Sequence, residues 1–176
     1  MLATLKDLIP DHARDIKLNL SGLGRQSALN EQQLFGTLLA CAIATRNRRL
    51  IDAAEAEVAD KLSAGAVNAA RAAASIMAMN NIYYRFVHLV SNREYGKIPA
   101  RLRMNVIGNP GIDKADFELY SLAVSAINGC GLCIDSHEKV LLDHGIAVAA
   151  IQDAVRIAAV IHGVAVALES QVPAAA

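Results

Sequence analysis

Residues 117–137 read FELYSLAVSAINGCGLCIDSH, and this stretch predicts one helix, a tight turn and the start of a second helix. Residues 119–134 carry no charge, but they number only 16 and include serines, an asparagine and glycines. A helix that spans a membrane needs about 20 apolar residues. The stretch therefore predicts a helix buried in a protein core, with Asn128-Gly129 as its end.

Helices are also expected on both sides of this stretch, because capping residues precede apolar segments with helical periodicity. The candidate N-caps are Asn30, Ser63 and Asp113. Alanine, the best helix former, occupies 33 of 176 positions, and only 4 prolines are present. The sequence therefore predicts an all-α fold. The expected helices cover residues 31–45, 50–61, 64–79 with a continuation over 80–95, 115–127, 130–144 and 148–169, with an irregular segment over 96–112.

The composition fits a single domain over residues 1–176 and excludes some partners. Basic and acidic residues number 17 each, so the basic excess that nucleic-acid binding requires is missing. The N-terminal segment Met1–Asp7 shows no signal-peptide pattern, and we expect a cytoplasmic protein without a membrane partner. A hydrophobic content of 54% in so small a chain indicates that some surface is buried between subunits.

The chain contains a weak internal repeat, with halves at roughly residues 29–95 and 112–170. A shift of 83 residues aligns the halves and pairs Cys130 and Cys133 with Asn47 and Leu50. We interpret the pattern as a duplication of one helical unit. In this interpretation only the second half carries thiol chemistry.

The strongest chemical signal is Cys130-Gly-Leu-Cys133, with His137 one helical turn after the second cysteine. Two cysteines at this spacing can close a small disulfide reversibly, and one thiol of such a pair often has a lowered pKa. A helix N-terminus favours the thiolate, and an imidazole within reach can take the thiol proton. We interpret the motif as a redox site.

Two other interpretations of this motif are open. Cys130, Cys133 and His137 are acceptable zinc ligands, although the sequence holds no second ligand pair, so Glu118 or His144 would have to complete the site. Alternatively, the cysteines are inert core residues beside a surface histidine.

Glu118 is the second candidate, because it lies in an otherwise uncharged helix. Together with Ser121, Ser125 and Asn128 it forms a polar stripe at helical spacing that leads to Cys130. A carboxylate on this stripe can orient a histidine or exchange a proton with it. The alternative is an ordinary solvated helix face.

The remaining candidates are expected to have structural roles. Cys41 is expected to be a core thiol, and His162 a core or interface histidine. Three arginines, Arg46, Arg48 and Arg49, are expected at a solvated helix end rather than in an anion or partner site. Three aromatic residues, Tyr83, Tyr84 and Phe86, are expected in the core or in a subunit interface rather than in a substrate pocket.

Glu118, eleven intervening residues and then Cys130-x-x-Cys133-x-x-x-His137 form a pattern that resembles the alkylhydroperoxidase D family. This family belongs to the wider carboxymuconolactone decarboxylase-like superfamily. The resemblance covers nearly the whole chain. It includes the segments Asp15–Leu20, Leu34–Leu39, Ala44–Asn47, Met77–Asn81, Leu102–Asn105, Asn109–Ile112 and Ala123–Cys130.

The resemblance implies an all-α, two-repeat fold, a homotrimer and a thiol peroxidase that reduces organic hydroperoxides. It also implies two protein partners, a lipoyl-bearing acyltransferase whose dihydrolipoyl dithiol donates electrons, and a two-cysteine peroxiredoxin that receives them. Cys133 matches the peroxidatic cysteine that becomes a sulfenic acid, and Cys130 matches the resolving cysteine and proton donor. Glu118 and His137 match the proton relay. Leu132 departs from members that have histidine there, so more of the relay rests on His137.

The expected activity is therefore peroxide reduction through a reversible Cys130–Cys133 disulfide, without a bound metal, haem or flavin. One alternative is a protein disulfide-relay adaptor with little direct peroxidase activity, which would use the same residues. A second alternative is a ring-cleavage decarboxylase of the same superfamily, although that reaction has no use for a dithiol. A third is a helical assembly without enzymatic activity.

Overall fold

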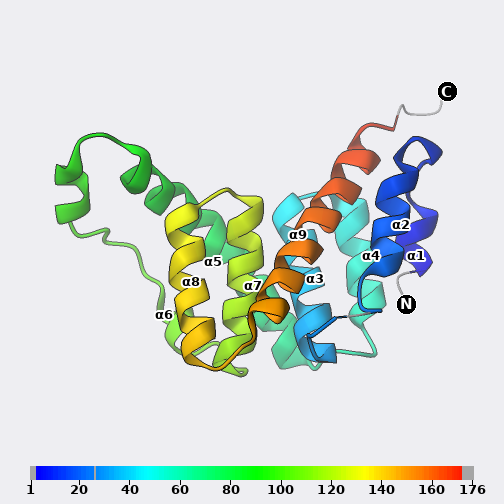
Figure 1. The fold of residues 1–176 in the computed structure, drawn as a ribbon, viewed down its shortest axis with the longest axis horizontal. Helices are drawn as coiled ribbons and strands as arrows, with labels where there is room; N and C mark the ends of the chain where they lie inside the picture. Colours follow the sequence, from blue (N-terminus) through cyan, green and yellow to red (C-terminus); the bar gives the residue numbers. More distant parts are fainter. Residues whose placement is uncertain (1–2, 26, 172–176) are drawn as a thin grey trace.

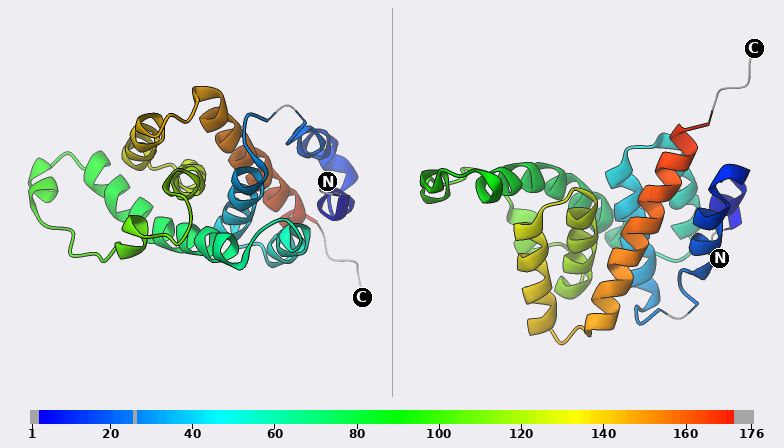
Figure 2. Two further views of the ribbon diagram at one scale, coloured as in Figure 1. Left: turned by 90° about the horizontal axis from the view of Figure 1, so that it is seen from below. Right: turned by 45° about the horizontal axis from the view of Figure 1, so that its top comes forward.

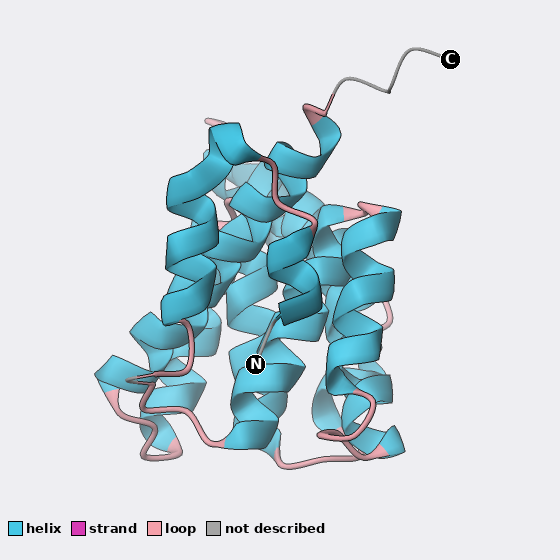
Figure 3. Ribbon diagram, turned by 90° about the vertical axis from the view of Figure 1, so that its right-hand side faces the viewer, coloured by secondary structure: helices cyan, strands magenta, loops and turns pink. Residues whose placement is uncertain are grey.

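The computed structural model describes residues 3–25 and 27–171, and within these ranges it contains helices and no strand (Figures 1 and 3). The all-α fold predicted from the sequence is confirmed. The elements in chain order are α1 (Ala3–Asp7), the 3-10 helix η1 (Asp11–Ala13), α2 (Arg14–Gly22), α3 (Glu31–Thr45), α4 (Arg48–Val58), α5 (Ala64–Leu89), the 3-10 helix η2 (Arg93–Lys97), α6 (Asn105–Gly108), α7 (Lys114–Ile127), α8 (Gly131–Asp143) and α9 (Val148–Glu169).

The predicted N-caps begin the helices as expected. The Asn30 side chain accepts a hydrogen bond from the backbone N–H of Gln33 at 2.9 Å, and the Gln33 side chain accepts one from the backbone of Asn30 at 3.1 Å. This reciprocal pair is a capping box. Ser63 caps α5 and Asp113 caps α7 in the same way, each with one bond to a first-turn N–H.

Helix α4 begins two residues earlier than predicted, because Arg46 and Asn47 make the turn on their own. Arg46 adopts a left-handed backbone with φ 62°, and its N–H donates to the carbonyl of Ile43. Asn47 then caps α4, its side chain accepting from the N–H of Leu50 at 2.8 Å. The arginines around this turn are exposed, as predicted.

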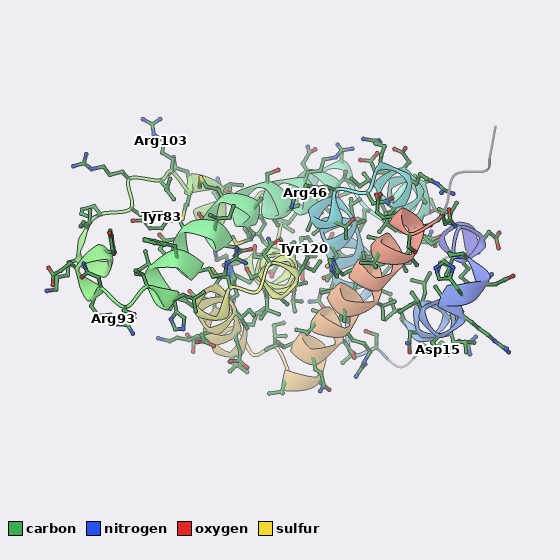
Figure 4. The ribbon with its side chains drawn as sticks, turned by 90° about the horizontal axis from the view of Figure 1, so that it is seen from above. Asp15, Arg46, Tyr83, Arg93, Arg103 and Tyr120 are labelled. Carbon is green, nitrogen blue, oxygen red and sulfur yellow. A yellow bond between two sulfur atoms is a disulfide. The ribbon has the colours of Figure 1, made fainter. Side chains whose placement is uncertain are left out.

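Helix α5 is one continuous helix of 26 residues that ends at Leu89 rather than at Tyr95. Its last turns lie beyond the bundle and lead into η2 and an extended segment over 98–104, which together form an arm that projects from the bundle (Figures 1 and 2). In Figure 4, Arg93 and Arg103 lie on this arm, far from Tyr120 in the bundle. The arm carries four exposed large apolar side chains, Phe86, Leu89, Tyr95 and Ile98.

The arm corrects one prediction. Tyr83, Tyr84 and Phe86 do not pack in the core, because the two tyrosines are only half-buried and Phe86 lies in the exposed last turns of α5. Phe86 is exposed and stacks edge-on against Tyr95 at 5.2 Å between ring centroids. Their placement in a subunit interface stays a prediction.

The core lies between α3, α5, α7 and α9, which pack against one another. Gly36 lets α3 approach α7 closely, because a Cβ at this position would lie 2.0 Å from the hydroxyl oxygen of Tyr120. The buried Tyr120 hydroxyl donates to the carbonyl of Gln32 at 2.9 Å, which fixes the two helices in register. These contacts hold α7, the helix that carries Glu118, at the centre of the bundle.

Helix α9 is long and apolar enough to cross a membrane by length and composition. In this structure 61% of that apolar window is buried inside the protein, against α3 and α7 among others. Its apolar character is therefore explained by its place in the core.

The order of the helices follows the predicted repeat. Helices α3, α4 and α5 begin at residues 31, 48 and 64, and α7, α8 and α9 begin at residues 114, 131 and 148. These starts have the spacing that a duplication requires. The duplication itself, and the single domain over residues 1–176, stay predictions.

Candidate active site

The turn between α7 and α8 places the first cysteine. Gly129 has a positive φ of 68°, which a residue without a side chain adopts at no steric cost. The N–H of Cys130 donates to the carbonyl of Ser125 at 3.1 Å, and the N–H of Gly129 donates to that of Ala126 at 3.2 Å. These two bonds form a Schellman motif that ends α7 and leaves Cys130 as the N-cap of α8.

Cys130 and Cys133 are joined by a disulfide at the start of α8. Cys133 occupies the third position of the helix, where free backbone N–H groups and the helix dipole favour a thiolate. The two sulfurs differ in access, because Cys130 is fully buried whereas Cys133 is 7% exposed. An incoming reagent therefore reaches Cys133 first.

Glu118 and His137 lie in direct contact, as the predicted relay requires. The Nδ1 of His137 lies 2.5 Å from Oε2 of Glu118, and both side chains are buried. The second carboxylate oxygen, Oε1, lies 2.6 Å from the Nζ of Lys114, one turn earlier on α7. The carboxylate thus holds two donors, one on each oxygen.

This arrangement keeps Glu118 ionised. Burial raises the pKa of the Glu118 carboxyl, but hydrogen bonds from His137 and Lys114 lower it by more, so that the pKa lies below its ordinary value of 4.5. An ionised carboxylate can only accept, so Nδ1 of His137 carries a proton and donates it to this bond. In the neutral imidazole, Nε2 is then unprotonated and able to act as a base.

The Nε2 atom of His137 faces the sulfur of Met77 at 3.3 Å, and a thioether is only a weak hydrogen-bonding group. Both residues border a cavity of about 500 Å³ that lies between α5, α7, α8 and the segment around α6. Cys133 also lines this cavity, whereas Cys130 does not. The cavity wall is mostly apolar and includes Met77, Tyr84, Met104, Ile107, Leu132 and Val140.

The polar stripe on α7 is buried, so the solvated-face alternative for Glu118 is wrong. The Asn81 amide donates to the Ser125 hydroxyl at 2.9 Å, and the Asn128 amide donates to the Asn81 oxygen at 2.9 Å. Arg85 donates to the Asn128 carbonyl at 2.6 Å. This network ties α5 to the turn that carries Cys130.

Other candidate residues lie away from this site. Cys41 is fully buried, which raises the pKa of its thiol, in agreement with the predicted core role. His162 is exposed on α9, so its predicted core placement is wrong, and an interface role stays a prediction. His144 lies at the opposite end of α8 from the cysteines, about 20 Å away. In the part of the chain that the structure describes, no cluster of three His, Cys, Asp or Glu side chains has metal-binding geometry.

Three residues of the site were missed in the sequence interpretation. Lys114 lies four residues before Glu118, the spacing of a helical ion pair, and this signal could have identified it. Met77 and Asn80 lie on α5, which the sequence does not link to α8. Only the packing of α5 against α8 brings them to the cavity.

The structure is an all-helical bundle with a CxxC pair at the start of a helix. The comparison with known proteins identifies a family for it. Residues 93–176 match the Carboxymuconolactone decarboxylase family. The chain is 63% identical to the alkyl hydroperoxide reductase AhpD of Rhodopseudomonas palustris (strain BisA53), over 96% of this chain and 93% of the relative. It is 63% identical to that of Bradyrhizobium sp. (strain ORS 278) and 58% identical to that of Brucella canis (strain ATCC 23365 / NCTC 10854 / RM-666), over 94% of this chain in both cases and over 92% and 95% of the relatives.

These relatives are similar over nearly their full length, and their identity is far above the level at which chance similarity occurs. The chain therefore belongs to the AhpD family. The resemblance predicted from the motif and the flanking segments is confirmed.

Proposed function

We propose that this chain is a thiol peroxidase that reduces alkyl hydroperoxides with Cys133 and Cys130. The observation that carries the proposal is the position of Cys133, at a helix start and on the wall of a cavity that His137 and Glu118 also border. The relatives named alkyl hydroperoxide reductase AhpD support the same reaction. The proposed reaction has three steps, and it uses only protein groups, the hydroperoxide and an external dithiol.

In the first step His137 takes the proton of the Cys133 thiol on Nε2, and Glu118 stabilises the imidazolium through Nδ1. The thiolate attacks the terminal oxygen of the hydroperoxide. An S–O bond forms, the O–O bond breaks, and the alkoxide leaves with the electron pair. The imidazolium returns its proton to the alkoxide, which leaves as the alcohol, and Cys133 becomes a sulfenic acid.

In the second step the sulfur of Cys130 attacks the sulfur of Cys133. The S–S bond forms, the S–O bond breaks, and the proton of the Cys130 thiol leaves with the hydroxide as water. The product is the disulfide that the structure contains. Leu132 lines the cavity but carries no titratable group, so in this proposal His137 and Glu118 form the whole relay.

In the third step a dithiol of the dihydrolipoyl type, carried by an acyltransferase protein, reduces the disulfide. One of its thiolates attacks Cys133, the more accessible sulfur, and Cys130 leaves. The second thiol of the dithiol then resolves the mixed disulfide. The same reduced pair can pass its electrons to a two-cysteine peroxiredoxin, and we propose a homotrimer as the working form.

The test is turnover of cumene hydroperoxide with dihydrolipoamide as reductant. Cys133→Ser and Cys130→Ser should each abolish turnover, and Cys41→Ser should keep it because Cys41 lies in the core. Cys130→Ser should still consume one equivalent of hydroperoxide and form a sulfenic acid on Cys133, which dimedone traps. Full turnover by Cys133→Ser would refute the proposal, and turnover only in the presence of a peroxiredoxin would favour the adaptor function.

A further inference from the structure

The side-chain oxygen of Asn80 is buried at the active-site cavity without a hydrogen-bond partner among the described residues. Asn80 lies on α5, one turn after Met77 and one turn before Tyr84, and all three side chains line the cavity. The residue is only 4% exposed. Hence α5 carries a buried, unpaired acceptor on a side chain that lines the same cavity as Cys133 and His137.

The neighbouring amide shows that this helix can satisfy a buried asparagine. Asn81 hydrogen bonds both Ser125 and Asn128 with its side chain. A buried acceptor without a donor is destabilising, whereas an apolar side chain of the same shape would not be. An unpaired acceptor on a cavity wall therefore points to a ligand that brings a donor.

We propose that Asn80 binds the hydroperoxide by accepting a hydrogen bond from its O–H group. The inference rests on the proposed function and adds the residue that orients the substrate. An alkyl hydroperoxide has a single donor hydrogen, and it lies on the terminal oxygen, the atom that the Cys133 thiolate attacks. Holding this O–H selects the orientation in which the terminal oxygen lies deep in the cavity.

The rest of the cavity fits this orientation. The alkyl group can contact the apolar wall formed by Met104, Ile107 and Leu132. Both oxygens of Glu118 already hold donors. Ser136 also lines the cavity, but it is exposed, so water can satisfy its hydroxyl. The buried Asn80 oxygen is therefore the acceptor for the substrate O–H, and the imidazolium of His137 is left to protonate the alkoxide.

The test compares Asn80→Leu with the wild type and with Met79→Leu, an apolar change at the neighbouring position of α5, where the side chain does not line the cavity. For Asn80→Leu we expect kcat/KM for cumene hydroperoxide to fall about 10- to 100-fold. The rate at which methyl methanethiosulfonate modifies the reduced protein should stay unchanged, because this reagent has no donor hydrogen. The thermal midpoint should be equal or higher, since an unpaired buried acceptor is removed. Met79→Leu should leave all three measurements near the wild-type values.

An unchanged kcat/KM in Asn80→Leu, with an active wild type, overturns this inference and leaves the proposed function intact. A parallel fall in thiol modification and in the thermal midpoint also overturns it, because it shows a structural role. Binding of cumyl alcohol, which offers the same O–H donor without an O–O bond, is measured by NMR titration as a readout independent of turnover. The dissociation constant should rise at least fivefold in Asn80→Leu, and equal binding by both proteins refutes the inference even if the wild type turns over no hydroperoxide.

Discussion

Replacing Glu118 by glutamine tests the relay directly. The carboxylate accepts from Lys114 on one oxygen and from His137 on the other, at 2.6 and 2.5 Å. A glutamine side chain of the same shape has only one oxygen to offer, and its NH₂ group is a donor. In Glu118→Gln, the glutamine NH₂ group therefore faces the donor of either Lys114 or His137, and that residue loses its hydrogen bond.

The magnitude follows from the bond that is lost. A hydrogen bond to a charged, buried group contributes about 1.5–3 kcal/mol, and Lys114 can partly replace its bond with water because its side chain is 32% exposed. We expect the free energy of unfolding at pH 7 to fall by about 2 kcal/mol, or roughly 4–8 °C in the thermal midpoint. We expect kcat/KM for cumene hydroperoxide to fall about 100-fold, because the imidazolium of His137 loses its counter-charge.

The pH dependence of folding stability is a second test of whether ionised Glu118 stabilises the protein. The pKa of Glu118 is lowered in the folded protein, so its stabilising effect is full above the ordinary value of 4.5 and is lost as the pH falls through the lower folded value. The stability gap between the wild type and Glu118→Gln should therefore narrow below about pH 4.5. Thermal melts by circular dichroism between pH 3 and pH 8 measure it.

Glu138→Gln is the matched control, because it makes the same charge change at an exposed position next to His137 on α8. It should change neither the turnover nor the pH dependence of stability. If Glu118→Gln behaves like Glu138→Gln in both measurements, the carboxylate neither orients nor stabilises the histidine. The relay would then be excluded, and the helix N-terminus would be the activating group.

Two further predictions concern assembly and packing. Light scattering at micromolar concentration should give the mass of three chains of 18.7 kDa each, because the arm exposes apolar side chains that a subunit interface would cover, whereas the mass of one chain would contradict the trimer. Gly36→Ala should lower the free energy of unfolding by roughly 1–3 kcal/mol in denaturant titrations, because the new methyl group meets the Tyr120 ring at 2.0–2.6 Å. Gly65→Ala, where the nearest atom lies 3.7 Å away, should be neutral or slightly stabilising, and an equal loss in both variants would show that the Tyr120 contact is not the cause.

Helix positions could be predicted because their signals are local. A cap such as Asn30 or Ser63 acts within one turn, so the sequence next to it contains the whole interaction. The continuity of α5 could not be predicted in the same way. The sequence predicted a helix over 64–79 that continues over 80–95, but its polar pair Asn80-Asn81 gives no local reason for one unbroken helix. Both side chains are buried, and this tertiary environment supports the continuous helix.

The same distinction applies to the site. Cys133 and His137 share one helix, so their spacing predicts that they lie on the same face. Glu118 could be linked to this motif by the polar stripe that leads to Cys130 and by the family resemblance, but its contact with His137 depends on how α7 packs against α8. Asn80 had no such link. Its proposed role in substrate binding rests on the unpaired side-chain oxygen, and only the three-dimensional structure shows that this oxygen has no hydrogen-bond partner among the described residues.

In the predicted repeat, the start of α4 corresponds to the start of α8, and the two helix starts can be compared. Asn47 is the N-cap of α4, and its side chain links to the third helical position through the N–H of Leu50. Cys130 is the N-cap of α8 and makes no capping hydrogen bond, but its sulfur links to the third helical position through the disulfide with Cys133. In both halves the cap and the third residue are joined, by a hydrogen bond in one and by a covalent bond in the other. The first-turn N–H groups of α8 thus have no side-chain cap. When the disulfide is reduced, these groups can stabilise a thiolate at Cys133. In the proposed reaction, the helix start that holds the oxidised pair together therefore becomes, on reduction, the place where the nucleophile Cys133 is activated.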